Sequence, residues 1–298
     1  MEDNFFLGCE IIKVYYTCGA CYMRQVRDTV DLATDDADLK FKIIQDALTF
    51  LAENFDENLQ SNSTGTRIQQ YIKKETGCED PYKLEKIESN RIALDVLPKV
   101  REILKEDDSL ETFVKIAIVG NIIDFGAYGL DADWEAMINE GLKKDLVIND
   151  IESFEKALNK YDDVLYLVDN TGEIVFDKLL IEKIKSYGVK VTVAVKEKPI
   201  LNDACMKEAL ESGLDEVADI ISTGADSVGI VESMVSDEFL EYFRNSPFII
   251  SKGMGNYEGI TEMDLESQDV FVLLATKCPA ISNHVGVDIG SHILHKLS

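Results

Sequence analysis

Four oxygen-bearing side chains follow one stretch of β-forming residues in the middle of the chain. The run Val164–Val168 ends at Asp169 and Asn170, and Glu173 and Asp177 follow where a helical pattern begins. Buried carboxylates are costly unless a cation neutralises them. The pattern therefore predicts a cation at the end of this strand.

Another acidic residue, Asp203, follows the next β-forming run, at residues 190–195. If the two strands are parallel, their carboxyl ends meet at one edge of the sheet, where ligands bind. Two carboxylates and an amide oxygen form a hard site suited to magnesium, manganese or another divalent ion. We expect Asp169, Asn170 and Asp203 to be its ligands, and the alternative is that both aspartates cap helices.

A glycine-rich segment, SKGMGNYEG at residues 251–259, follows a later β-forming run. Lys252 places a cation at the strand end, and glycines such as Gly253 allow close approach of the backbone to a ligand. The amides that follow can hold an anion. This pattern predicts an anion-binding turn, with an ordinary glycine-rich turn as the alternative. The sequence contains neither the phosphate-loop nor the dinucleotide-binding fingerprint.

One polar pair interrupts an apolar segment. Asn121 and Asp124 lie one helical turn apart within GNIIDFG, residues 120–126. Buried polar side chains need partners. A structural hydrogen bond is the plainest interpretation of this pair, and a role in a site is the alternative.

The six cysteines are too few for a disulfide scaffold in 298 residues. Cys18 and Cys21 form a C-x-x-C motif, which suits half of a zinc site, a redox pair or two buried thiols. Cys78 or Cys278 could complete a thiolate site in three dimensions. Since the local sequence does not supply four ligands, we slightly favour a reduced thiol pair near the pocket.

The first half of the chain has apolar residues at helical spacing and no convincing strand. Ser89 is expected to cap one of its helices, and Pro98 to break or kink the same helix. The expected helices lie within residues 40–55, 89–106 and 110–129.

The second half alternates β-forming runs with helical stretches, which predicts a parallel sheet covered on both faces. We therefore expect an α/β fold with two domains. A mainly helical domain spans residues 1–150, and a Rossmann-like α/β domain spans 151–298 with the site at the carboxyl ends of its strands. The strands are expected at 164–168, 190–195, 218–222, 247–251 and 270–275.

An excess of acidic residues restricts the partners of this protein. With 56 acidic and 30 basic residues, the net charge is −26, a field that repels nucleic acid and anionic membranes. The chain has no apolar run of membrane-spanning length and no secretory signal at its start. We expect a cytoplasmic protein that binds neither partner, and no pattern indicates an oligomeric state.

Taken in order, the motifs closely resemble the damage-control phosphatases, a family long described as a domain of unknown function that overlaps the acidic-residue methyltransferase proteins. The C-x-x-C motif is similar to that of the prokaryotic branch. The motifs are Cys18-x-x-Cys21, Asp80-Pro81-Tyr82 with Lys86 and Asn90, Gly120-Asn121-x-x-Asp124, Asp169-Asn170-x-Gly172-Glu173, Leu201-Asn202-Asp203, Lys252 to Glu258, and Lys277-Cys278.

This resemblance implies a metal-dependent phosphatase that acts on small phosphorylated metabolites, often side products or damaged forms. It implies that Asp169, Asn170 and Asp203 hold a magnesium, manganese, cobalt or nickel ion. The residues expected to bind the substrate are Asn121, Asp124, Lys252, Gly253, Asn256 and Glu258.

We expect Asp169, Glu173, Asp203 and Lys252 to be catalytic. The ion would neutralise charge on the phosphoryl group, Lys252 would hold phosphoryl oxygens, and Glu173 would orient a water or act as base. The nucleophile could be a metal-activated water or a carboxylate. Two alternatives are a methyl-donor-dependent carboxyl methyltransferase, although DNTGE has a single glycine, and a non-catalytic protein that binds a metal or metabolite.

Overall fold

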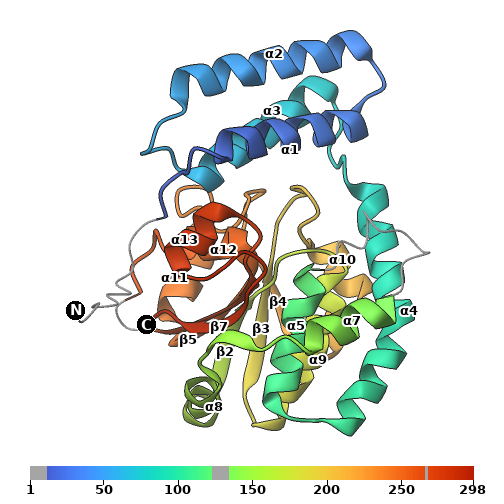
Figure 1. Cartoon of the computed structure of the whole chain (residues 1–298), viewed down its shortest axis with the longest axis vertical. Coiled ribbons are helices and arrows are strands. Elements are labelled where there is room, and N and C mark those ends of the chain that lie inside the picture. Colours follow the sequence, from blue (N-terminus) through green and yellow to red (C-terminus); the bar gives the residue numbers. More distant parts are fainter. Residues whose placement is uncertain (1–11, 123–133, 266–267) are drawn as a thin grey trace.

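A seven-stranded sheet forms the centre of the computed structural model, which describes residues 12–122, 134–265 and 268–298 (Figure 1). The strand order is β1-β7-β6-β5-β2-β3-β4, and all neighbouring strands are parallel except β6 and β7. The strands are β1 (Leu146–Asn149), β2 (Asp163–Leu167), β3 (Lys190–Val195), β4 (Asp219–Ser222), β5 (Phe248–Lys252), β6 (Asp269–Ala275) and β7 (His292–Lys296).

Helices cover both faces of this sheet, as the apolar character of its strands requires. Their apolar sides bury one core on one face and two on the other, and a fourth core lies between α4, α5, α7 and α9. One face carries α5 (Leu110–Ile122), α8 (Ile151–Lys160) and α9 (Glu173–Ser186), with α4 (Lys83–Glu106) and α7 (Trp134–Leu142) outside them; α10 (Met206–Glu211) contacts α4. The other face carries α11 (Asp237–Asn245), α12 (Gly253–Ile260) and α13 (Pro279–Val285).

Three N-terminal helices form a unit at the top of Figure 1, namely α1 (Cys18–Ala33), α2 (Ala37–Asn54) and α3 (Ser61–Thr76). They pack around a small apolar core of their own, which includes Val26, Ile43 and Ile72. Helix α3 also contacts α12, so this unit reaches the carboxyl end of β5. Among the described residues, no helix is long and apolar enough to cross a membrane.

The α/β fold with a helical N-terminal part is confirmed, and each of the five expected strands is present within about one residue of its expected ends. Two further strands were not expected. Strand β1 lies in the half that was expected to contain none, where it is short, partly exposed and paired with β7 alone. Strand β7 mixes two histidines and a lysine with apolar residues, so its pattern is weak.

The expected cap of helix α4 at Ser89 and the expected break at Pro98 were both wrong. The helix begins at Lys83, so Ser89 is an interior residue and does not cap it. Pro98 lies inside the continuous helix and does not end it. Proline removes one helical hydrogen bond, but Pro98 is exposed and Leu94, whose carbonyl loses that partner, is exposed as well, so water can replace the bond.

Candidate functional site

The loops that follow β2 and β3 are joined by their backbones. Asp169 and Asn170 follow β2, and Asp203 lies between β3 and α10. The amide of Thr171 donates to the carbonyl of Asn202 at 2.9 Å, and Asn170 and Asp203 form an isolated antiparallel bridge. The parallel sheet therefore brings the three expected ligands to one edge.

Two asparagine amides contact the Asp169 carboxylate. Asn121, from the last turn of α5, donates Nδ2 to Asp169 Oδ2 at 2.8 Å, and Asn170 donates Nδ2 to the same oxygen at 3.1 Å. The helices that follow have Gly172 and Cys205 at their N-cap positions. Neither Asp169 nor Asp203 is thus the N-cap residue that the alternative reading required.

The Asp169 carboxylate carries an uncompensated electrostatic cost. Desolvation, together with the neighbouring carboxylates of Glu173 and Asp203, raises its pKa to about 8. Lys277 and the Asn121 hydrogen bond act in the opposite direction without cancelling the effect. An additional positive charge at this position would lower the cost.

Gly253 allows Asp169 to approach the N-terminus of α12. Its φ is 78°, and a Cβ atom at this position would lie 1.8 Å from Asp169 Oδ2. The Asp169 carboxylate therefore occupies the space that a side chain would fill. The positive end of the helix dipole favours a negative charge here.

Lys252 is fully buried and points into the protein. Its Nζ donates to Glu173 Oε1 at 2.5 Å, to Asp177 Oδ1 at 2.6 Å and to the carbonyl of Ala117 at 3.0 Å. An ammonium group has three hydrogens, so these contacts use all of them. Lys252 thus holds two acidic residues of α9, and the carboxylates keep its pKa above the ordinary value in spite of burial.

Glu173 is buried and connects this ion pair to the strand-end loop. Its Oε2 accepts from Asn121 Nδ2 at 2.6 Å and from the backbone amide of Asn170 at 3.3 Å, while Oε1 accepts from Lys252. Both oxygens are therefore engaged within the protein. This arrangement fits a residue that positions Asn121 and Asn170.

Two buried lysines flank Asp203. Lys196 Nζ lies 3.6 Å from Asp203 Oδ2 and donates to the carbonyl of Gly229 at 2.6 Å. Lys86 Nζ is 3.6 Å from Asp80 Oδ1 and has no hydrogen-bond partner among the described residues. Burial raises the pKa of Asp203, and the charges of Lys196 and Lys86 oppose that shift.

The remaining residues expected to bind the substrate differ in their surroundings. Asn256 is buried and donates Nδ2 to the carbonyls of Val168 and Lys252, both at 2.9 Å, so it ties the ends of β2 and β5 together. Glu258 lines a cavity beside α1. Asp124 lies outside the described residues.

Three further residues belong to this region. Lys277, two residues after β6, is exposed and donates Nζ to the carbonyl of Asn121. Lys277 is one of the motif residues named from the sequence. Lys196 was missed, although it directly follows β3 and the rule that placed Asp169 and Asp203 at strand ends would have found it. Asn90 Oδ1 accepts from the Gly172 amide at 2.9 Å and fixes the turn before α9. Asn90 is named in the motif series, but a single asparagine inside a helix gives no signal for this contact with Gly172.

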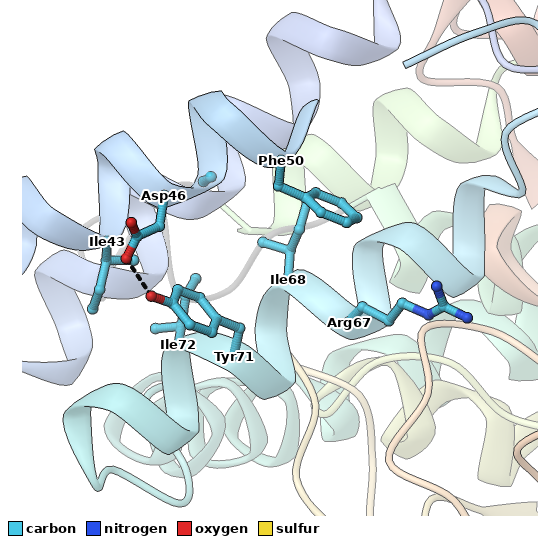
Figure 2. Close-up of a pocket in the computed structure, with 8 residues that line it drawn as sticks. Ile43, Asp46, Phe50, Arg67, Ile68, Tyr71 and Ile72 are labelled. Carbon is cyan, nitrogen blue, oxygen red and sulfur yellow. Dashed lines mark hydrogen bonds between the residues drawn. The ribbon is translucent and has the colours of Figure 1, made fainter. Parts of the chain in front are cut away.

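Two cavities lie near the N-terminal helices. One of about 290 Å³ lies between α2 and α3, is mostly apolar and contains the hydrogen-bonded pair Tyr71 and Asp46 (Figure 2). The other, of about 610 Å³, lies beside the strand-end site, and we call it the α1–α13 cavity. Its lining includes Cys18, Cys21, Ser61, Glu258, Lys277 and Cys278.

The donor set of the strand-end site fits a hard divalent ion. Carboxylates of Asp169 and Asp203 and the amide of Asn170 are oxygen donors of the kind such ions prefer. The buried Oδ1 of Asn121 has no hydrogen-bond partner in the described parts of the chain. Those parts contain no cluster of three His, Cys, Asp or Glu side chains arranged to hold a metal, so water and substrate would have to complete the coordination.

Comparison with known proteins gives consistent matches along almost the whole chain. Residues 14–293 match the damage-control phosphatase ARMT1-like domain. The chain is 39% identical over 296 residues to an uncharacterized protein of Methanocaldococcus jannaschii, with 96% of each chain covered. It is 35% identical over 281 residues to a damage-control phosphatase of Pyrococcus horikoshii, covering 94% of this chain and 96% of that one.

A solved structure shows the same fold. The crystal structure of a DUF89 family protein from Pyrococcus horikoshii superimposes with a TM-score of 0.87 at 34% sequence identity. The match covers 96% of this chain and 99% of that chain. The similarity therefore includes both the N-terminal helices and the sheet.

The close approach of Asp169 to Gly253 leads to a first prediction. Gly253→Ala should destabilise the protein and displace the Asp169 carboxylate, because the new methyl group and that oxygen cannot occupy the same space. Gly77→Ala is the matched control, since Gly77 also has a positive φ, of 69°, but no atom within 4 Å of the added Cβ. Its cost should be the backbone strain alone, about 1–2 kcal/mol. Equal losses of unfolding free energy in urea would contradict this placement of Asp169.

Proposed function

The chain belongs to the damage-control phosphatase family, which supports a phosphatase function in metabolite repair, and we propose that it is a metal-dependent enzyme. Its proposed reaction is the hydrolysis of phosphate esters of small metabolites. Sugar phosphates, including damaged or side-product forms, are the proposed substrate class. The observation that carries the proposal is the joining of the loops after β2 and β3, which places Asp169, Asn170 and Asp203 together.

In this proposal Asp169, Asn170 and Asp203 hold one divalent ion, such as manganese or magnesium. Such an ion would supply positive charge to the phosphoryl oxygens and lower the pKa of a bound water. The Asn170 amide now donates Nδ2 to Asp169 and Glu173 at 3.1 and 3.3 Å, so it would turn to present its oxygen. Glu173 and Asn121 would keep the Asp169 carboxylate in place.

Lys277 is the proposed cation that contacts the phosphate. Its side chain is exposed, it lowers the pKa of Asp169 by its proximity, and it lines the α1–α13 cavity. Its hydrogen bond to the Asn121 carbonyl can be exchanged for a stronger bond to an anionic oxygen. Lys252, whose hydrogens are all used within the protein, would position Glu173. The first turn of α12 adds a helix N-terminus beside the same point.

The methyl-transfer alternative receives less support from this geometry. A cofactor-binding loop after β2 would present its backbone amides to the ligand, but the Gly172 amide already donates to Asn90 Oδ1 at 2.9 Å. The Thr171 amide is likewise used by Asn202. We therefore assign the strand-end site to phosphoryl chemistry.

Removing either acidic ligand should abolish activity while the protein stays folded. Asp169→Asn and Asp203→Asn should each lower phosphate release by at least about 100-fold, because even partners outside the ligand shell are worth about 10–100-fold. Phosphate release would be measured with sugar phosphates, nucleotides and phosphopantetheine, with and without added divalent metals.

Asp219→Asn is the control for these variants. Asp219 starts β4 at the opposite edge of the sheet and is exposed in a salt bridge with Lys190, so its loss should leave activity near that of the parent. Near-parental turnover by Asp169→Asn or Asp203→Asn with metal present would exclude the proposed ligand set.

The two lysines should give opposite results. Lys277→Met should leave the unfolding free energy within about 0.5 kcal/mol of the parent and raise KM for phosphate esters by about 10-fold or more. Lys252→Met should cost about 3–5 kcal/mol, since it leaves buried carboxylates without their cation. Urea unfolding and steady-state kinetics measure both effects. If Lys252→Met were stable with a raised KM and Lys277→Met were unaffected, the assignment would be wrong, and Lys252 would be the lysine that contacts the phosphate.

A further inference from the structure

The C-x-x-C motif lies in the wall of the α1–α13 cavity. Cys18 is the first residue of α1, Cys21 lies one turn later, and Cys278 reaches the same cavity from the start of α13. These thiols are free, and Cys78 is not among the lining residues. Within the described residues, no three potential ligands are arranged to hold a metal. The zinc-site reading of the motif is therefore disfavoured relative to thiol chemistry.

The two thiols of the motif have different surroundings. Cys21 Sγ accepts from Arg24 Nη2 at 3.6 Å and from Gln25 Nε2 at 3.9 Å, so this sulfur is held beside a guanidinium group. Burial raises the pKa of Cys18, and the nearby Glu258 carboxylate raises it further. We therefore assign Cys21, which contacts the Arg24 guanidinium, as the sulfur that attacks a disulfide, while the raised pKa of Cys18 keeps that thiol protonated until the second step.

Helix geometry makes a bond between these cysteines possible but strained. Residues three apart in a helix have Cβ atoms about 5–6 Å apart, whereas a disulfide needs about 4 Å. The first turn of α1 would have to tighten, and its backbone amides are the ones without helical partners. Strained disulfides are reduced readily, so such a bond would be reversible.

Tightening of this turn would change the shape of the cavity. The backbone amide of Cys18 donates to the carbonyl of Tyr15 at 2.8 Å, and the amide of Tyr15 donates to Cys18 Sγ at 3.4 Å. Movement of Cys18 would therefore carry residues 15–17 with it. Thr17 and Val14 line the cavity whose other wall holds Lys277.

We propose that Cys18 and Cys21 form a reversible disulfide that narrows the α1–α13 cavity and weakens substrate binding. The effect on substrate rests on the proposed function. The Cys21 thiolate attacks one sulfur of a low-molecular-weight disulfide, which forms a mixed disulfide and releases one thiolate. Cys18 then loses its proton to water and attacks the Cys21 sulfur, releasing the second thiolate. The protein gives up two electrons and two protons, and the small disulfide is reduced to two thiols.

The bond itself is tested by treating the full-length protein with oxidised glutathione and mapping its peptides by mass spectrometry. The expected product is a Cys18–Cys21 disulfide. Cys18→Ser should trap a glutathione adduct on Cys21, and Cys21→Ser should leave Cys18 unmodified. Cys278→Ser is the matched control, because it removes a thiol from the same cavity and should still form the bond. A Cys21–Cys278 disulfide, or none, would overturn the assignment.

The consequence is tested by kinetics with a phosphate ester. Oxidised protein should show a KM raised several-fold at nearly unchanged kcat, with reversal by dithiothreitol, and the Cys18→Ser/Cys21→Ser double variant should not respond. An unchanged KM after full oxidation would overturn the link to substrate binding. Zinc in the parent that is lost from the double variant would overturn the dithiol reading. If the reduced parent had no phosphatase activity, the proposed function would fail, while peptide mapping would still decide the disulfide.

Discussion

Carboxylates that repel one another at the carboxyl ends of β2 and β3 are the constraint on which this structure depends. The backbone bridge between Asn170 and Asp203 fixes the separation of the two loops, so the acidic side chains cannot move apart without breaking it. Desolvation and the neighbouring charges raise the pKa of Asp169 to about 8. The fold must therefore bring positive charge and hydrogen-bond donors to this edge, and much of the surrounding architecture does so.

Each layer of the protein contributes one of these compensating groups. Helix α5 provides Asn121, whose amide bonds to both Asp169 and Glu173. Strand β5 provides Lys252, which neutralises the acidic face of α9 inside the protein. The helical first half is thus part of the site, although its sequence resembles a separate helical unit. Lys277 is the cation that remains exposed, which is why we assign the phosphate contact to it.

The sequence predicts the strands and the grouping at their ends because both follow from a simple rule. Alternating strands and helices imply a parallel sheet, and residues directly after parallel strands share one edge. The direction of a long side chain follows from packing, which no local pattern contains. Lys252 and Lys277 both follow strands and look equivalent in sequence, yet one is fully buried among acidic groups and the other is exposed. The antiparallel pairing of β7 with β6 was also missed, because it depends on the partner strand and not on the local sequence of β7.

The central claim, that the strand-end carboxylates need a divalent ion, is tested most directly by the unfolding temperatures of the parent and Asp169→Asn. The pKa of Asp169 is higher in the folded protein than in the unfolded chain. The protonated side chain therefore favours folding at low pH, and this contribution to stability is lost as pH rises towards about 8. With a chelator at pH 8, Asp169→Asn should therefore be more stable than the parent, and the difference should vanish near pH 4. Added manganese should raise the unfolding temperature of the parent and leave that of Asp169→Asn unchanged. Equal stabilities in chelator at both pH values, or an equal response of the two proteins to manganese, would contradict the account.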